Sequence, residues 1–386
     1  MSDGHHTAGH TRRGASFGLV ACLGLLLPSA ALAQGSIFSL NGLGWSARPV
    51  SARTGATAGA LAMFDPTMNA NPAALTRWRS VAAWGVGAPT TRSYTSPTVS
   101  ADLQTVRFPL FGFATILPTR TAISFSISDY LDRTWTLTEA DSLPLRGQME
   151  KFTDAGRSIG GISDLTLAAG YRLTSTFSVG LGLHYYLGST RLTSQRLYAN
   201  AAYQQVLEQS QTDFRGAGAG VGVLWTLPRL DLSASGRLNG RLRSHNTSGE
   251  VTHTHLPAQL ALGVRWQAVP GVFLAGTAQY DAWKSAEVDL GAGTVRDVWS
   301  LGVGAEVQSA TLLHIRTPLR LGYRVRTLPF TSLGAAIKEH ALSGGVGFNL
   351  AHDRTTVDVG LEGGSRSAGV AKESFRTVFV GLTVRP

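Results

Sequence analysis

The stretch "FSVGLGLHYYLG", residues 177–188, alternates large apolar side chains with small or polar ones. The apolar phase consists of Phe177, Val179, Leu181, Leu183, Tyr185 and Leu187. The other phase consists of Ser178, Gly180, Gly182, His184 and Gly188. A period of two residues places successive side chains on opposite faces of a β-strand. The stretch therefore predicts a strand with one apolar face and one small or polar face.

The same alternation returns in "LALGVRW" (260–266) and "TVFVGLTVR" (377–385). About fourteen such segments follow one another, and most run for roughly ten residues or more. Strands of soluble sandwiches are usually shorter, whereas long apolar-out, polar-in segments are typical of outer-membrane barrels. After residue 33, no run approaches the eighteen or so apolar residues of a membrane helix. The sequence predicts an all-β fold, a transmembrane antiparallel β-barrel of about 14 strands.

Connection lengths between these segments alternate. We predict short turns near Pro118, Ser175, Pro228, Pro270, Ala310 and His352. Longer loops are expected between them, above all at 139–159 and 193–209. Outer-membrane barrels have short periplasmic turns and long extracellular loops. Both ends of the barrel chain are therefore expected on the periplasmic side.

Residues 1–33 read as a secretory signal peptide, because Arg12 and Arg13 precede the apolar run "FGLVACLGLLLPSAALA". The single cysteine, Cys22, lies within this run, so the exported chain is expected to contain no disulfide. We expect the signal peptide to be removed, and the chain to reside in the cell outer membrane of a Gram-negative-type bacterium.

Residues 34–78 show no clear strand period and are rich in Ala, Gly and Ser. Helix signals occur at "SARTGATAGALAMF" (51–64) and at Asn71-Pro72. An Asn side chain can cap a helix, and Pro is well suited to the first helical position, so a short capped helix is predicted over 71–78. We interpret 34–78 as an N-terminal helical plug and 79–386 as the barrel.

Several stretches carry a family resemblance. They are Asn71-Pro72-Ala73-x-Leu75, "LPAQLALGVRWQAVPGVFLAGTAQYDAW" (256–283) and the last strands, including "ESFRTVFVGLTVRP" (373–386). Together they resemble the outer-membrane long-chain fatty-acid transporter family (FadL/TodX-type) or a close barrel relative. The resemblance implies a fourteen-stranded barrel with an N-terminal hatch that contains Asn71, Pro72, Ala73 and Leu75. It also implies passive uptake of hydrophobic molecules through an opening in the wall.

Arginines gather in the polar phase of two predicted strands. Strand 313–327 contributes Arg316, Arg320 and Arg324, beside His314 and Arg326, and strand 230–243 contributes Arg237 and Arg241. Phase predicts that these five arginines point into the lumen. A guanidinium cluster there could bind a ligand carboxylate. The alternative is a structural ion-pair network with Glu306, Asp358 and Glu362.

Other conspicuous residues suggest less. His253 and His255 are too few for a metal site and read as part of an exposed loop. The tryptophans of the apolar phase are expected in an aromatic girdle at the membrane surface: Trp84, Trp225, Trp266 and Trp299. His184 falls in the lumen phase, which argues against a barrel phospholipase. We find no serine elbow, metal-ligand spacing or paired-carboxylate motif, so no enzyme activity, metal or cofactor is predicted.

The formal charge of +10 comes mostly from Arg, and the arginines are scattered along alternating strands. Nucleic-acid binding normally requires a clustered basic patch, so a nucleic-acid partner is disfavoured. Expected partners are outer-membrane lipid and lipopolysaccharide, a hydrophobic small-molecule ligand and the outer-membrane barrel assembly machinery. We predict a passive channel for hydrophobic or amphipathic small molecules such as long-chain fatty acids. The alternative is a non-transporting barrel that acts as a scaffold or shuttle for secreted or surface proteins.

Overall fold

The computed structural model describes residues 35–47, 50–97, 100–312, 315–332 and 334–386. The predicted signal peptide, residues 1–33, lies outside this part of the chain. Within the described residues, no helix is long and apolar enough to cross a membrane.

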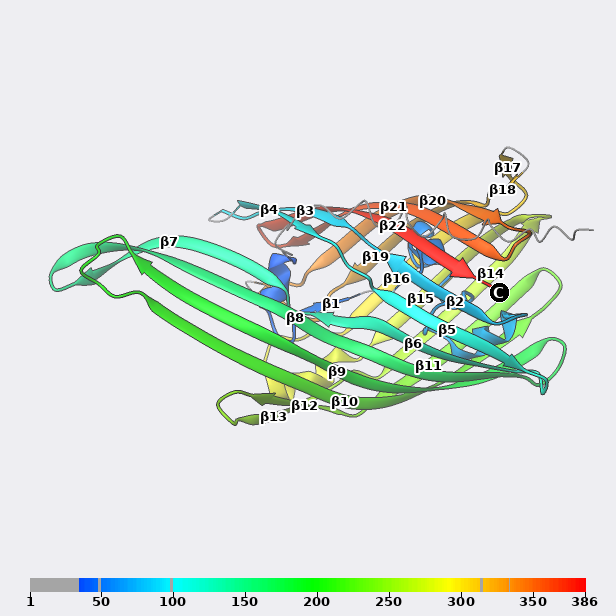
Figure 1. The fold of residues 1–386 in the computed structure, drawn as a ribbon, viewed down its shortest axis with the longest axis horizontal. Helices are drawn as coiled ribbons and strands as arrows, with labels where there is room; N and C mark the ends of the chain where they lie inside the picture. Colours follow the sequence, from blue (N-terminus) through cyan, green and yellow to red (C-terminus); the bar gives the residue numbers. More distant parts are fainter. Residues whose placement is uncertain (1–34, 48–49, 98–99, 313–314, 333) are drawn as a thin grey trace, which may run out of the picture. The chain divides into compact units, whose positions relative to one another are not determined.

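Fourteen antiparallel strands form the wall of a closed barrel (Figure 1), as predicted. Several wall strands consist of two segments in line. In chain order the wall strands are β2 (Ala82–Gly87) with β3 (Thr90–Thr95), β4 (Ser100–Thr105) with β5 (Leu110–Leu117), β6 (Thr121–Asp132) with β7 (Trp135–Leu145), β8 (Gln148–Arg172), β9 (Phe177–Tyr198), β10 (Val206–Thr226), β11 (Leu230–Asn239) with β12 (Arg241–Asn246), β13 (Val251–His255) with β14 (Gln259–Val269), β15 (Val272–Asp281), β16 (Val298–Val307), β19 (Leu319–Thr327), β20 (Lys338–Leu350), β21 (Thr355–Ala368) and β22 (Ala371–Val384). The last strand, β22, pairs with β2 and β3 and so closes the barrel.

The strands β7, β8, β9 and β10 project beyond the rest of the wall at one end of the barrel (Figure 1). We call this projection, residues 135–158 and 189–215, the arm. The prediction of long loops at 139–159 and 193–209 is wrong for most of those residues, because β7 pairs with β8 from Trp135↔Ser158 to Leu145↔Gln148. Pairing of β9 with β10 continues as far as Arg196↔Val206. Polar side chains on both faces of these segments led to the prediction of loops. Strand pairing nevertheless satisfies their backbone hydrogen-bonding groups, as water would in a loop.

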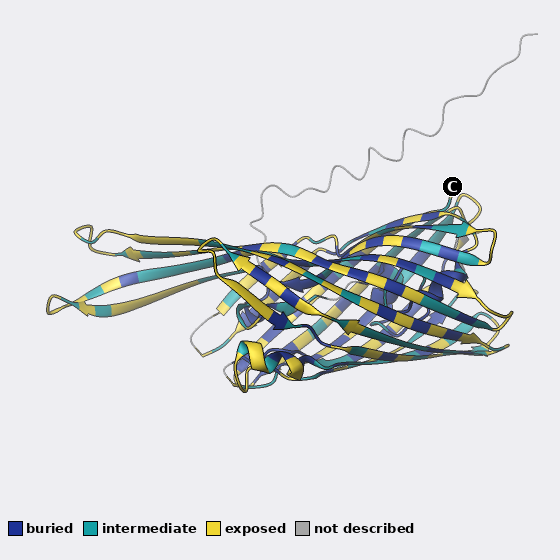
Figure 2. Cartoon of the chain, turned by 90° about the horizontal axis from the view of Figure 1, so that it is seen from below, coloured by how far each residue is buried: buried dark blue, intermediate teal, exposed yellow. Residues whose placement is uncertain are grey.

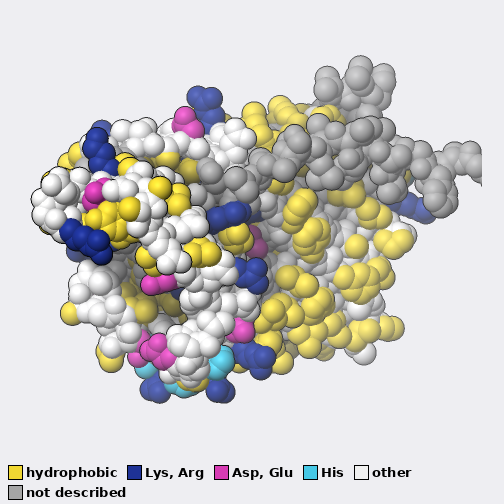
Figure 3. Space-filling view, turned by 60° about the vertical axis from the view of Figure 1, so that its left-hand side comes forward, with side chains coloured by type: hydrophobic (Ala, Val, Ile, Leu, Met, Phe, Trp, Pro, Cys, Tyr) yellow, Lys and Arg dark blue, Asp and Glu magenta, His cyan; other side chains and the backbone are white. Residues whose placement is uncertain are grey.

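Apolar side chains cover much of the outer wall on the face that Figure 3 shows. Exposed and buried residues alternate along the wall strands (Figure 2). Leu181, Leu183 and Tyr185 are about half exposed there, in agreement with the two-residue period that predicted them. Trp225, Trp266 and Trp299 are exposed in the same way. Trp84 does not belong to an outer girdle, so this prediction is wrong. It is buried and faces inward, because the apolar phase of β2 packs on the plug rather than on lipid.

The remaining elements are short. They are η2 (Ile37–Leu40), β1 (Trp45–Ser46), α1 (Ala52–Ala56), η3 (Pro72–Arg77), η4 (Trp283–Ala286), α2 (Glu287–Leu290), β17 (Thr311–Leu312) and β18 (Ile315–Arg316). The predicted strand 313–327 begins only at Leu319, since β17 and β18 form a separate two-stranded hairpin before it. His314 lies outside the described residues.

Candidate functional site

The described residues of the predicted plug, 35–47 and 50–78, lie inside the barrel, and we call this segment the plug. It consists mainly of short helices joined by turns and bends. The Ser51 side chain caps α1 by accepting from the Thr54 amide. The Asn71 side chain likewise caps η3, where Oδ1 accepts from the Ala73 amide at 2.9 Å. The predicted cap at Asn71 and the first helical position of Pro72 are confirmed, although the helix is a 3-10 helix. Short caps of this kind hold a chain segment that has few backbone hydrogen bonds of its own.

Asn71 also joins the plug to the wall. Its Nδ2 donates to Ser233 Oγ at 2.7 Å and to the Val223 carbonyl at 3.1 Å. The other residues of the motif, Pro72, Ala73 and Leu75, are buried. The motif therefore belongs to a part of the plug that touches β8, β9, β10 and β11.

Glycines of the wall let the plug approach closely. A Cβ built at Gly180 would lie 2.4 Å from both the Ala73 nitrogen and the Pro72 carbonyl carbon. One built at Gly322 would lie 2.2 Å from the Thr57 carbonyl carbon. Any side chain at these positions would collide with the plug backbone. The lumen-facing glycines of the wall therefore leave room for the plug.

Two ion pairs fasten the plug to the wall. Arg53 donates from Nη2 and Nε to the Glu306 carboxylate at 2.6 and 2.7 Å. Arg77 donates from Nη2 to Asp231 Oδ2 at 2.7 Å. Burial alone would lower the pKa of Arg53, but the neighbouring Glu306 charge raises it above its usual value. The Arg53 pair is bidentate, and such pairs are strong and directional in a partly dry environment.

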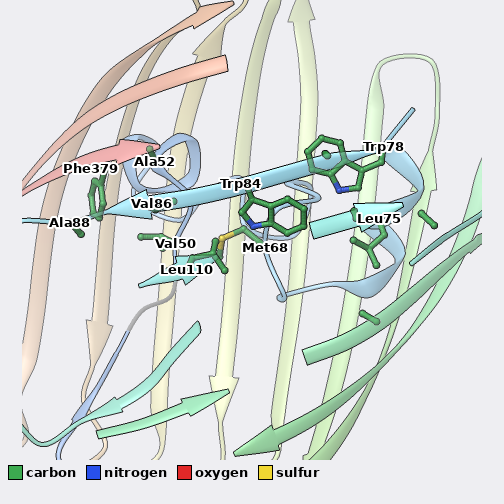
Figure 4. Packing of buried hydrophobic residues seen from close by; sticks show 14 residues of the cluster. Val50, Ala52, Met68, Leu75, Trp78, Trp84, Val86, Ala88, Leu110 and Phe379 are labelled. Carbon is green, nitrogen blue, oxygen red and sulfur yellow. The ribbon is translucent and has the colours of Figure 1, made fainter. Parts of the chain in front are cut away.

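An apolar cluster fills the space between the plug and the strands near the barrel closure (Figure 4). Trp78 of the plug stacks on Trp84 of β2, with ring centroids 5.6 Å apart. Val50 and Met68 of the plug and Phe379 of β22 belong to the same cluster. The plug is thus held both by apolar burial and by ion pairs.

The plug lies between two cavities. The mouth cavity, of about 960 Å³, is lined by Arg53, Asp231, Arg320 and the turns around Pro228 and Asp353. The inner cavity, of about 180 Å³, is on the side of the plug toward the arm, and its lining includes plug and wall residues. From the plug come Val50, Ala62 and Met68, and from the wall Ser128, Tyr130, Asp164, His184, Arg237 and Arg324, among others.

The five predicted ligand arginines do not form one cluster. Arg320 lines the mouth cavity and binds Glu306 at 2.8 Å and Asp358 at 2.6 Å. Arg324 lines the inner cavity and binds Glu339 at 2.7 Å and Glu362 at 2.9 Å. For these two arginines, the alternative of a structural network with Glu306, Asp358 and Glu362 is confirmed.

Arg237 faces the inner cavity, where Nη1 donates to Asp164 Oδ2 at 3.0 Å and Nη2 to the Asn69 carbonyl at 3.3 Å. It therefore links the wall, the plug and the cavity. Its role as a ligand-binding residue stays a prediction.

Arg241 does not point into the lumen, and that prediction is wrong. Gly218 pairs with Asn239, and Arg215 pairs with Arg243, so β11 and β12 together contain one more residue than the facing part of β10. An extra residue in a strand moves every later side chain to the opposite face. Arg241 is consequently exposed, and its Nε donates to His255 Nε2 at 3.0 Å.

Arg316 is also exposed, at the rim of the mouth cavity, because it belongs to the β17–β18 hairpin rather than to β19. It does not join Arg324 in the lumen. His255 lies outside the lumen as well, where its Nδ1 is 2.7 Å from Asp289 Oδ2.

The sequence did not predict that Asp164 and Thr166 lie beside His184. His184 faces the lumen as predicted, and its Nδ1 is 2.9 Å from Asp164 Oδ2 and 3.0 Å from Thr166 Oγ1. Antiparallel register brings them together, since Thr166 pairs with His184. The available signal was the polar phase of residues 160–172, which places Asp164 and Thr166 on the same face as His184 once the register is known.

Replacing Asn71 with alanine should reduce the stability of the plug in its position by about 1–2 kcal/mol, because the cap and two hydrogen bonds to the wall are lost. We expect faster amide hydrogen exchange across residues 73–78. Asn246→Ala is a matched control, since Asn246 Oδ1 accepts from the Ser248 and Glu250 amides in an exposed turn. Equal exchange in both variants would contradict an anchoring role for Asn71.

The fold and the plug together define a class, that of plugged fourteen-stranded β-barrels. The chain belongs to the BamG family, whose model matches residues 18–248, more than half of the 386 residues. No curated protein sequence matches the chain.

Several solved structures share the fold, and two of them are toluene transporters by name. The Ralstonia pickettii toluene transporter TbuX is 14% identical, with a TM-score of 0.57 over 87% of this chain and 98% of that one. The Pseudomonas putida toluene transporter TodX is 12% identical, with a TM-score of 0.60 over 88% and 98%. A Pseudomonas aeruginosa FadL homologue is 12% identical, with a TM-score of 0.58 over 88% and 99%. The FadL-type resemblance therefore holds for the fold, while the family itself is BamG.

Proposed function

We propose that the chain is a passive outer-membrane channel for hydrophobic or amphipathic small molecules, and that residues 35–78 gate it. The observation that carries this proposal is the position of the plug between an inner cavity of about 180 Å³ and a mouth cavity of about 960 Å³. The apolar outer face of the wall suits a bilayer with its lipid and lipopolysaccharide. We propose no enzymatic activity.

Movement of the plug can be tested through its ion pairs. Arg53→Gln together with Arg77→Gln should increase flux of a hydrophobic probe into vesicles, because two charged contacts to the wall are lost. Glu306 keeps its contact with Arg320, and Asp231 keeps its contact with Arg265, so neither carboxylate is left unpaired. Charged hydrogen bonds contribute about 1.5–3 kcal/mol. Losing one therefore raises the fraction of molecules with an unseated plug on the order of tenfold or more.

The measurement is uptake of a fluorescent long-chain fatty acid and of toluene by vesicles that contain the full chain. Arg196→Gln is the matched control, since Arg196 makes a bidentate pair with Asp154 at 2.7 Å in the arm, away from the plug. Flux that rises only in the plug variant would support a gated channel. Absence of flux for both probes, in wild type and plug variant alike, would refute it.

A second candidate function is supported by the family match. The family description, BamG, suggests a relation to the barrel assembly machinery, and a scaffold role would suit a plug that is firmly bonded to the wall. The arm offers a free strand for such contacts: within the described residues, β7 pairs only with β8. Site-specific crosslinking from Glu139 of β7 in intact cells would test this candidate. Capture of an assembly component, together with absence of probe flux, would favour it over the channel.

A further inference from the structure

The inner cavity contains two hydroxyl groups that the protein itself leaves unpaired. Tyr130 and Ser128 both lie on β6 and line this cavity. Tyr130 is 8% exposed and Ser128 is 2% exposed. Neither Tyr130 Oη nor Ser128 Oγ has a hydrogen-bond partner within the part of the chain that the structure describes. A buried hydroxyl without a partner destabilises a protein, so two of them in one cavity call for an explanation.

A third polar group in the same cavity has a defined hydrogen-bonding state. Asp164 accepts from Arg237 and lies 2.9 Å from His184 Nδ1. An ionised carboxylate can only accept, so the ring proton of His184 belongs on Nδ1. In the neutral ring, Nε2 is then left as an acceptor. The cavity wall also offers the two hydroxyls, each able to donate or to accept.

Part of the cavity lining suits an aromatic ring. Its plug lining includes the apolar side chains Val50, Ala62 and Met68. Thioethers make favourable contacts with aromatic rings. A cavity of about 150 Å³ lined by apolar residues is known to bind benzene, and the inner cavity of about 180 Å³ is of similar size.

We propose that the inner cavity binds a small hydroxylated aromatic molecule of the size of phenol. Its hydroxyl group bonds to Tyr130 Oη, and its ring packs against Met68. This inference rests on the proposed channel function and names the substrate class of that channel. A plain hydrocarbon ring would leave both protein hydroxyls unpaired, and sites built around hydrogen bonds discriminate strongly against ligands that lack the matching group.

The test is isothermal titration of the full chain in lipid nanodiscs with phenol and with toluene. We expect phenol to bind more tightly than toluene to the wild-type protein. Tyr130→Phe should weaken phenol binding by roughly three- to tenfold, the effect of one neutral hydrogen bond, and leave toluene binding unchanged. Tyr198→Phe is the control, because Tyr198 lies in the arm and away from this cavity.

A second readout separates a binding role from a structural one. Tyr130→Phe removes an unpaired hydroxyl, so the ligand-free variant should unfold at the same temperature as wild type or higher. A lower unfolding temperature with equal losses for phenol and toluene would overturn the proposal. It would also be overturned by phenol binding no more tightly than toluene. Vesicle flux of either compound tests the channel separately: flux without phenol preference refutes only this inference, whereas absence of all flux refutes the proposed function.

Discussion

Replacing Glu339 with glutamine should destabilise the barrel by about 3–5 kcal/mol, the usual consequence of breaking a buried ion-pair network. Glu339 is 1% exposed and accepts hydrogen bonds from Arg324, Arg326 and Arg366 at 2.7–2.8 Å. Arg324 also binds Glu362, and Arg366 also binds Glu373, so these two arginines keep a carboxylate. Arg326 would lose its ion pair altogether, because its salt bridge is to Glu339.

The measurement is urea-induced unfolding of the refolded barrel in phospholipid vesicles, followed by tryptophan fluorescence. Glu208→Gln, an exposed carboxylate in the arm, should change stability by less than about 0.5 kcal/mol. Adding Arg326→Gln to the Glu339→Gln variant should recover part of the loss, because it removes the unpaired buried charge. Equal midpoints for wild type and Glu339→Gln would show that the network contributes nothing to stability.

Gly180→Val should unseat the plug. A Cβ at this position would lie 2.4 Å from backbone atoms of Pro72 and Ala73, and backbone cannot rotate away as a flexible side chain can. Overpacking typically destabilises a protein by about 1–3 kcal/mol, and here it would weaken the contact between η3 and β9. We expect trypsin to cleave after Arg77 in the folded variant, while the wild-type plug stays protected.

Limited proteolysis with mass spectrometry measures this, and single-channel conductance provides a second readout. Gly363→Val is the matched control, since nothing lies within 4 Å of a Cβ built there and the residue is on an exposed face of β21. Cleavage after Arg77 that is no faster in Gly180→Val than in the control would mean that the wall yields instead of the plug. The close fit at this glycine would then have no part in holding the plug.

The predictions for Trp84 and Arg241 were wrong because they rested only on the alternation of apolar and polar residues along a strand. Trp84 is apolar and in phase, yet it faces inward, because the plug offers β2 an apolar partner inside the barrel. Arg241 is polar and in phase, yet it is exposed, because the additional residue between Asn239 and Arg243 reverses the faces. The two-residue period identifies the two faces of a strand, but it does not determine whether a face contacts lipid, solvent or the plug.

The cavity residues show the same limit. Tyr130 and Asp164 carry no motif, and nothing in their neighbours along the chain indicates that they share a cavity with His184 and the plug. Register across β6, β8 and β9 brings them together, and register depends on turns and bulges that act over many residues.

By itself, the sequence determined the barrel and the capped turn at Asn71-Pro72, because both follow from local rules. Alternation over long segments allows only a sheet with two unlike faces, and a closed barrel satisfies all of its backbone groups without an edge. Only the tertiary structure decided which arginines meet which carboxylates, where the plug divides the lumen and which hydroxyls remain unpaired. Those features depend on distances between segments far apart in the chain, which are set by strand register and by the fit of the plug against glycines such as Gly180.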